Sequence, residues 1–365
     1  MGVFDAVWVA AALAATAPLL LAGMGELISQ RAGVINVGLE GMMLFGAFFS
    51  YWAALEFGTI WGAMLVGAVA GVAIAAVMAF FSINTNSDQI VVGIGVLILA
   101  IGVTSSAFRA LFEGSERATI IKPMGRLEIP GLESIPFLGE AVFRQRPVVY
   151  LSFLLLPVVW FVLYRTTWGL AVRAAGDLPD AAETAGLSPR RIRWLATLAA
   201  GAFAGWAGAF LSVGEVGIFL NQMTSGRGFL AVAAVIFGMW RVSGLMWACL
   251  LFGATTALQR RLQIIPDLPR EVWLLLAIVA GVSLVYMLVR RRFDWQNRWH
   301  VVTAVALAAV SITTLVLSFV QPGITLPSEL WLSMPFVVTI AALAIMGARA
   351  AAPRYLAIPL IREHD

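Results

Sequence analysis

Long apolar runs, separated by short polar breaks, are the feature that most constrains the fold of this chain. The first run covers residues 6–24, and comparable runs recur as far as residue 346. A helix of about 20 apolar residues spans the hydrocarbon core of a bilayer. Only 12% of the residues are charged, against about 25% in a soluble domain. We therefore predict an all-α polytopic helix bundle in the lipid bilayer, a single domain over residues 1–365 with about 9–11 transmembrane helices.

The placement of arginine predicts how the bundle is oriented, because Lys and Arg collect on the cytoplasmic side of a membrane. No Lys or Arg precedes the first apolar run, and Arg31 follows it. Arginines nearer the C-terminus fall on the same side as Arg31; they are Arg290, Arg291, Arg292, Arg349, Arg354 and Arg362. We expect the N-terminus outside and the C-terminus inside, although Arg260 and Arg261 fall outside in this count.

Glycines within two of the apolar runs predict tight helix packing. Gly67 and Gly71 form a small-xxx-small pair, and Gly201, Gly205 and Gly208 lie among alanines. Small residues at such spacings let two membrane helices approach closely.

A polar segment over residues 173–193 lies between two apolar runs, so it must emerge into water. Its residues signal a short helix followed by the start of a longer one. The signals are the N-cap candidates Asp177 and Ser188, the first-turn prolines Pro179 and Pro189, the acid Asp180 and the helix stop Gly186. We expect either a compact helix that docks a water-soluble partner or an ordered loop without a partner.

Two polar residues interrupt the second apolar run, residues 33–55. Asn36 and Glu40 are four residues apart, a spacing that puts both on one face of a helix. A carboxylate at the centre of a span costs about 2.5–3.5 kcal/mol on insertion scales. Glu40 is therefore expected to face other helices or a water-filled cavity. The alternative is that Glu40 lies near the cytoplasmic rim and caps a neighbouring helix.

A pair of short or broken helices is expected near residue 241. Residues 228–240 are too few to cross a bilayer comfortably. Arg241 then interrupts the apolar pattern, and residues 245–258 form another short run. Broken helices at membrane depth occur where they line a cavity, although two short tilted packing helices would fit this pattern equally well.

The sequence contains no constellation that predicts chemistry of its own. One cysteine, Cys249, and two distant histidines, His300 and His364, suggest neither a metal site nor a catalytic triad. We find no GxxxxGK[ST] loop, so any ATP must be bound by another chain. A basic and aromatic strip for nucleic acid is also missing. We expect no catalytic residues, no metal and no cofactor.

Five blocks in this order resemble permease subunits of bacterial ABC importers of the nucleoside and simple-sugar type, in the branched-chain amino acid/ribose permease superfamily. The blocks are residues 25–48, 82–96, 165–213, 226–240 and 334–363. The resemblance implies a type II ABC importer permease fold in the cytoplasmic (inner) membrane. Residues 265–323 look inserted relative to the family, and they add two apolar spans at 271–289 and 301–320.

The resemblance also implies partners and sites. A separate cytoplasmic ATP-binding subunit would drive transport, a second homologous permease would complete the path, and an extracytoplasmic lipoprotein would deliver solute. The coupling loop for the ATPase would be residues 173–193, with Asp177, Pro179, Asp180, Glu183, Gly186, Leu187 and Arg190. Candidates for the translocation path are Asn36, Glu40, Asn84, Asn86, Gln89 and Asn221, each of which could equally stabilise helix contacts or ends.

Other functions remain open from the sequence. A branched-chain amino-acid ABC permease would share the same architecture. An ion-coupled carrier would need paired intramembrane acids or histidines, and Glu40 is the only clear acid that we expect near a span interior. An intramembrane enzyme would need a metal or nucleophile constellation.

Overall fold

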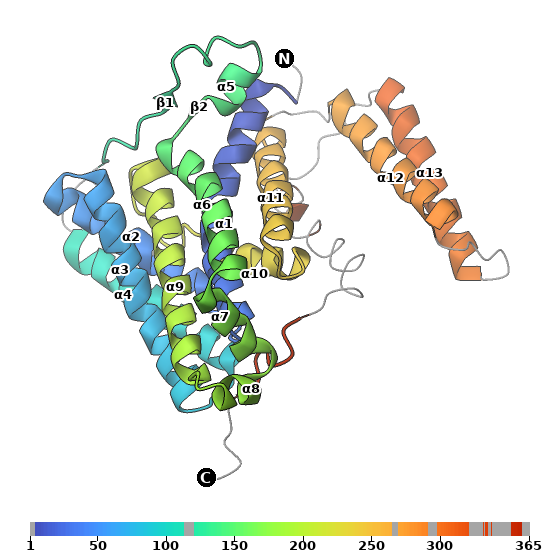
Figure 1. Cartoon of the computed structure of the whole chain (residues 1–365). Helices are drawn as coiled ribbons and strands as arrows, with labels where there is room; N and C mark the ends of the chain where they lie inside the picture. Colours follow the sequence, from blue (N-terminus) through green and yellow to red (C-terminus); the bar gives the residue numbers. More distant parts are fainter. Residues whose placement is uncertain are drawn as a thin grey trace.

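A computed structural model describes residues 4–112, 120–264, 269–290, 298–320, 331, 333–334, 337 and 352–359. Almost all of the regular structure in these residues is α-helical (Figure 1). The long helices are α1 (Ala6–Arg31), α2 (Leu39–Phe57), α3 (Ile60–Ala79), α4 (Gln89–Phe112), α6 (Pro147–Arg165), α9 (Pro189–Ala209), α11 (Val242–Leu262), α12 (Arg270–Arg290) and α13 (Arg298–Val320). The π-helical turns η1 (Phe80–Asn84) and η2 (Phe210–Val216) extend α3 and α9.

Shorter elements lie at the two ends of the bundle, except α10, which lies within it. They are α5 (Leu138–Val142), α7 (Thr167–Asp177), α8 (Pro179–Thr184), α10 (Arg227–Phe237) and the antiparallel strands β1 (Leu127–Glu128) and β2 (Arg144–Gln145). We call the end that carries α7 and α8 the α8 end, and the opposite end the strand end (Figure 1).

Six helices of the described residues are long and apolar enough to cross a membrane: α1, α3 with η1, α4, α6, α9 with η2, and α11. The prediction of a polytopic helical membrane fold is therefore confirmed. At 11 residues, α10 is too short to cross. The predicted short helix over residues 245–258 is wrong, because α11 has 21 residues. Arg241 is the N-cap of α11, and Arg260 and Arg261 lie in its last turn, so the charges mark its ends and do not break it.

Helix α9 lies at the centre of the bundle and packs closely on α2 and α3. A Cβ atom on Gly201 or Gly205 would collide with the backbone of Gly71 or Gly67, respectively, and one on Gly208 would collide with the backbone of Met43. The tight packing predicted from these glycines is confirmed. Because lipid tails are as apolar as leucine, such close van der Waals contact replaces the hydrophobic drive that would associate helices in water.

The chain starts at the strand end and finishes at the α8 end, as Figure 1 shows. The C-terminal residues 352–359 bind there through backbone bonds from Tyr355 N to Gly176 O (2.9 Å) and from Ala357 N to Gly33 O (3.1 Å). Buried Arg193 reinforces this contact by donating to the carbonyl oxygens of Ala32, Tyr355 and Ile358.

Helices α12 and α13 form a hairpin beside the bundle (Figure 1). They meet α1 and α11 through an apolar cluster at the strand end that includes Leu258, Leu262, Val272 and Trp273. The limits predicted for the insertion include residues 265–268, 291–297 and 321–323, which lie outside the described residues, so these limits stay a prediction. Arg291, Arg292, Arg349, Arg362 and His364 lie outside them too, as does most of residues 334–351.

Candidate functional site

The polar segment at the α8 end is a pair of helices joined at Leu178. Asp177 is the last residue of α7, so its predicted role as N-cap of α8 is wrong. The reason is that α7 continues through Asp177, with Leu178 N donating to Ala174 O (2.9 Å). Pro179 occupies the first turn of α8, as predicted.

The C-terminal end of α8 is a Schellman motif. Gly186 has φ +80°, and its N–H donates to Glu183 O (2.9 Å), while Leu187 N donates to Ala182 O (3.0 Å). These two bonds satisfy carbonyl groups that a helix end leaves free. Ser188 then caps α9 by accepting from Arg191 N (3.4 Å). The predictions for Gly186 and Ser188 are confirmed.

Most of the predicted coupling residues are exposed. Asp180, Glu183, Gly186, Leu187 and Arg190 are exposed, whereas Asp177 is half-buried and Pro179 is buried. A hollow of about 550 Å³ lies beside them, with a mostly apolar lining that includes Tyr164, Leu170, Leu178 and Leu187, and the arginines Arg31 and Arg173 at its edge. The segment therefore combines an acidic edge with an apolar hollow, which sequence reasoning missed.

Deeper in the bundle, Glu40 holds the N-terminus of α10. Its carboxylate is almost fully buried and accepts hydrogen bonds from Gly226 N (2.7 Å) and Gly228 N (2.6 Å). The positive end of a helix dipole favours a carboxylate at this place. Gly228 cannot carry a side chain, because a Cβ atom would lie 2.5 Å from the backbone of Glu40. Glu40 therefore faces another helix, as first expected, and caps it, as the alternative proposed, but it is buried inside the bundle.

Asn36 does not share a helix with Glu40, contrary to the prediction. Helix α2 begins only at Leu39, and Asn36 lies in the irregular segment that enters the bundle before it. Asn36 N donates to Glu26 Oε1 (3.1 Å), and Ile35 N donates to Gln89 Oε1 (2.9 Å). The N–H groups of Ile35 and Asn36 have no backbone partner among the described bonds, so these side chains supply their acceptors.

Glu26 is a second buried acid, so the expectation that Glu40 is alone near a span interior is wrong. Glu26 is fully buried in α1 and also accepts from Gln30 Nε2 (2.7 Å). Gln30 Oε1 in turn accepts from Trp240 Nε1 (2.6 Å). Among the described residues, Glu26 Oε2 and Asn36 Oδ1 have no hydrogen-bond partner. The first apolar run was predicted to end at residue 24, whereas α1 continues to Arg31. The i, i+4 spacing of Glu26 and Gln30 was the sequence signal that could have predicted this longer helix.

Two other path candidates, Asn84 and Asn86, are exposed, whereas Gln89 is buried beside Asn36. Asn84 is exposed, and its Oδ1 accepts from Arg190 Nε (3.3 Å) and Trp194 Nε1 (2.9 Å). Asn86 lies in the exposed turn that follows, with φ +52°. The structure therefore places Asn84 beside Arg190 of the predicted coupling loop, and Gln89 against the segment before α2.

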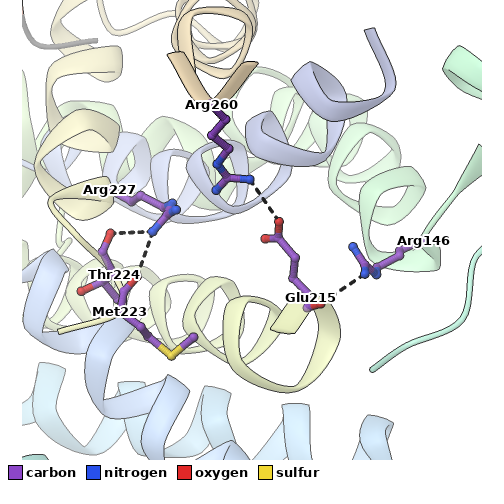
Figure 2. A network of polar contacts seen from close by, with 6 residues as sticks. All are labelled: Arg146, Glu215, Met223, Thr224, Arg227 and Arg260. Carbon is purple, nitrogen blue, oxygen red and sulfur yellow. Dashed lines mark hydrogen bonds and ion pairs between the residues drawn. The ribbon is translucent and has the colours of Figure 1, made fainter. Parts of the chain in front are cut away.

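At the strand end, three arginines and one glutamate form the network in Figure 2. Arg260 Nη1 lies 3.5 Å from Glu215 Oε1, and Arg146 Nη2 donates to Glu215 O (3.1 Å). Arg227 Nη1 donates to the carbonyl oxygens of Met223 (2.9 Å) and Thr224 (3.0 Å). Burial of the Arg146 guanidinium lowers its pKa from the ordinary value.

A cavity of about 420 Å³ opens at this network, lined by Glu215, Arg227 and Arg260. Asn221 also lines it, whereas Asn36 and Glu40 are not among its lining residues. In the part of the chain that the structure describes, no group of three His, Cys, Asp or Glu side chains could hold a metal ion. The arrangement offers hydrogen bonding and docking surfaces.

Comparison with known proteins gives relatives of one kind. The chain is 42% identical to the provisionally named glucose ABC transporter permease protein TsgC13 of Haloferax volcanii over 69% of this chain and 77% of that protein. It is 34% identical to the guanosine ABC transporter permease protein NupQ of Bacillus subtilis, over 74% of this chain and 87% of that protein. It is 33% identical to the nucleoside ABC transporter permease protein NupC of Lactococcus lactis, over 66% of this chain and 78% of that protein.

Each of these three organisms also has a second ABC transporter permease that matches this chain more distantly, at 26%, 26% and 24% identity. No solved structure matches the chain. The family model described as "Branched-chain amino acid transport system / permease component" matches residues 9–287. The chain therefore belongs to this family of ABC importer permeases and is a multi-pass membrane transport subunit.

Proposed function

We propose that this chain is the permease subunit of an ABC importer that moves nucleosides or simple sugars across the bacterial cytoplasmic membrane, driven by ATP hydrolysis in a separate subunit. The names of the three relatives support this solute class. A nucleoside or sugar is neutral and rich in hydroxyl groups, so its path needs polar side chains but few unpaired charges. The buried acids here fit that need, because Glu40 and Glu26 are both bound by protein donors.

The observation that carries the proposal is α8. It is a short helix, started by Pro179 and closed by the Schellman motif at Gly186, which exposes Asp180 and Glu183. We infer that the ATP-binding subunit docks on this helix, with leucines entering the adjacent hollow and the acids meeting basic groups. ATP binding would then bias the bundle between two arrangements by its different affinity for each.

Two further partners complete the proposed importer. The second, more distant permease in each of the three organisms supports a heterodimer of permeases, with this chain as one half. An extracytoplasmic substrate-binding lipoprotein would deliver the solute at the strand end. The α8 end would then face the cytoplasm, as the arginine distribution predicts.

The path candidates divide by their contacts. We assign Glu40, Asn36 and Gln89 to positioning of the backbone. The side chains of Glu40 and Gln89 accept from backbone N–H groups where the chain bends, and the backbone N–H of Asn36 donates to Glu26. Asn84 and Asn86 support the coupling segment. Asn221, which is exposed beside the cavity at the strand end, is the candidate that we assign to solute.

The docking proposal can be tested by reversing two charges. Asp180→Lys combined with Glu183→Lys should abolish co-purification of the ATP-binding subunit and reduce ATP-driven uptake of labelled nucleoside or glucose at least about tenfold. A matched control is Glu56→Lys combined with Glu140→Lys, which reverses two exposed acids at the strand end. Equal co-purification with both double variants, or uptake by the purified chain alone under an ion gradient, would contradict the proposal.

A further inference from the structure

The Arg193 guanidinium joins three segments of the chain at the α8 end. Arg193 lies near the start of α9 and is only 2% exposed. Its Nε donates to Ala32 O (3.1 Å), Nη1 to Ile358 O (2.8 Å) and Nη2 to Tyr355 O (3.2 Å). A buried guanidinium needs such partners, because an unpaired buried charge costs several kcal/mol. The C-terminal residues 352–359 therefore supply two of the three acceptors that Arg193 uses.

The same C-terminal residues bind the ends of α1 and α7 through their backbone. Tyr355 N donates to Gly176 O (2.9 Å) in the last turn of α7, and Ala357 N donates to Gly33 O (3.1 Å) just after α1. Leu356, between them, packs against the apolar core. Figure 1 shows this segment in red, near α7 and α8. One short segment is thus bonded to α7, α9 and the end of α1.

This junction lies between the proposed docking helix and the interior of the bundle. A Cβ atom on Gly176 would collide with Arg31 O, so the end of α7 lies directly against the end of α1. Arg31 in turn donates to Trp240 O in the turn after α10. On the other side, α7 passes into α8 at Leu178, two residues after Gly176.

We propose that residues 352–359 are a clasp that fixes α7 and α8 on the bundle, and that Arg193 is the positioning residue that holds the clasp. The inference rests on the proposed function, in which the ATP-binding subunit docks on α8 and displaces it. Without the clasp, α7 and α8 would move together without moving the bundle. With the clasp bound, α7 is tied to α1 and α9, so a displacement of α8 is passed on to those helices.

Ala357 allows the clasp to be opened without a change inside the bundle. It is exposed and has φ +62°, which glycine adopts freely and proline cannot. Ala357→Pro removes the N–H that binds Gly33 O and excludes this φ, whereas Ala357→Gly keeps the bond and relieves strain. Arg193→Lys is the complementary change, because lysine lacks the planar fork of donors. Ala357→Pro keeps the proposal testable if Arg193→Lys does not fold.

Release of the clasp can be measured with Leu356→Cys in a Cys249→Ser background. Leu356 is half-buried, so a maleimide reacts fully only when the segment leaves the bundle. In the chain purified with its second permease and ATP-binding subunit, Ala357→Pro and Arg193→Lys should each raise the labelling rate at least about tenfold. Ala357→Gly should not raise it, and neither should Arg354→Lys, a change at an exposed residue of the same segment.

The coupling role is tested in proteoliposomes that contain the complete importer, with its lipoprotein and labelled guanosine or glucose. Ala357→Pro and Arg193→Lys should lower solute uptake per ATP hydrolysed at least about fivefold. The ATP-binding subunit should still co-purify, because the exposed acids of α8 are unchanged. A purely structural role would lower the yield and the melting temperature but leave this ratio unchanged.

An unchanged ratio in Ala357→Pro, together with rapid labelling of Leu356→Cys, would overturn the coupling role. Slow labelling in both Ala357→Pro and Arg193→Lys would overturn the clasp itself. Absent uptake of every solute by the unmodified importer would instead refute the proposed function, and the labelling rates would still show whether Arg193 holds the segment.

Discussion

Single polar side chains inside this bundle bind backbone groups where the chain departs from helix. Glu40 binds the free N–H groups at the start of α10, and Glu26 binds the N–H of Asn36 before α2. In lipid no water can serve these groups, and each unsatisfied one costs several kcal/mol. The two buried acids are therefore explained by the backbone N–H groups whose hydrogen bonds they accept.

The role of Glu26 can be separated from its charge by substitution. Glu26→Gln keeps an oxygen that accepts from Gln30 and Asn36, so it should change the free energy of unfolding by less than about 1 kcal/mol. Glu26→Ala leaves both donors buried and unpaired, and should destabilise the chain by about 2 kcal/mol or more. Thermal unfolding of the purified chain in detergent would show the difference. Equal melting temperatures for both variants would contradict the backbone-positioning role.

At the scale of elements, α10 is a short helix fixed at both ends. Glu40 holds its N-terminus, while the turn after it is held by Gln30 and by Arg31, whose Nε and Nη2 donate to Trp240 O. Met239 and Trp240 in this turn have φ near +50° (+51° and +52°), a strained conformation for residues with side chains. Arg31 also borders the hollow beside α8, so α10 connects the proposed docking surface to the interior.

Arg31→Lys tests this connection. Lysine cannot make the paired bonds of a guanidinium, so the turn should loosen while α8 stays intact. We expect the ATP-binding subunit to co-purify normally, while solute uptake per ATP hydrolysed falls by about threefold or more. Arg109→Lys, at an exposed arginine in α4, is the control. If solute uptake per ATP hydrolysed were unchanged in Arg31→Lys, α10 would have no role in coupling ATP hydrolysis to transport.

A second contact between elements joins the start of α1 to the end of α11. Arg261 donates to Asp5 through two bonds, of 2.6 and 2.7 Å. This guanidinium, together with the N–H of Trp8, holds the pKa of the Asp5 carboxyl well below its usual range. A carboxyl with a lowered pKa stabilises the folded state at any pH above its ordinary value, and this contribution is lost as the pH falls through the folded value.

Asp5→Asn should therefore lower the melting temperature, because it removes the charge that pairs with Arg261. The amide oxygen of asparagine can still cap α1, so the effect reports the ion pair. The difference from the unmodified chain should be constant between about pH 5 and pH 8, and should shrink below about pH 4. Melting curves at a series of pH values would measure it. A difference that grows on acidification would have the wrong sign for this pair.

At the scale of the whole molecule, the two ends of the bundle differ in kind. The α8 end presents acids beside an apolar hollow, and the strand end presents a cavity lined by the Arg260–Glu215 ion pair and by Arg227. A permease needs two different ends if one partner delivers solute on one side of the membrane and another hydrolyses ATP on the opposite side. The hairpin of α12 and α13 touches the bundle only near the strand end among the described contacts, so it leaves the α8 end open to a partner.

Orientation in the membrane can be measured with two matched cysteines in a Cys249→Ser background. A cysteine at Ser188, beside α8, should resist a membrane-impermeant maleimide in intact cells and react after the membrane is opened. A cysteine at Ser134, exposed at the strand end, should react in intact cells. Labelling of the Ser188 position in intact cells would reverse the orientation and exclude docking of a cytoplasmic ATPase on α8.

The amino-acid sequence by itself determined the features that depend on local chemistry. Apolar runs marked the membrane helices, Pro179 and Gly186 marked the ends of α8, and the glycines of α9 marked its close contacts. These predictions hold because chain length, backbone conformation and side-chain volume act within a few residues or along one helix face.

Only the tertiary structure decided what the interior polar groups do. Glu40 is satisfied by Gly226 and Gly228, and Gln30 by Trp240, all distant in the sequence. A short-range pattern cannot contain such partners, so the spacing of Asn36 and Glu40 suggested a shared helix face where the chain instead bends. The cavity at the strand end likewise exists only because η2, the segment before α10 and the end of α11 converge in space.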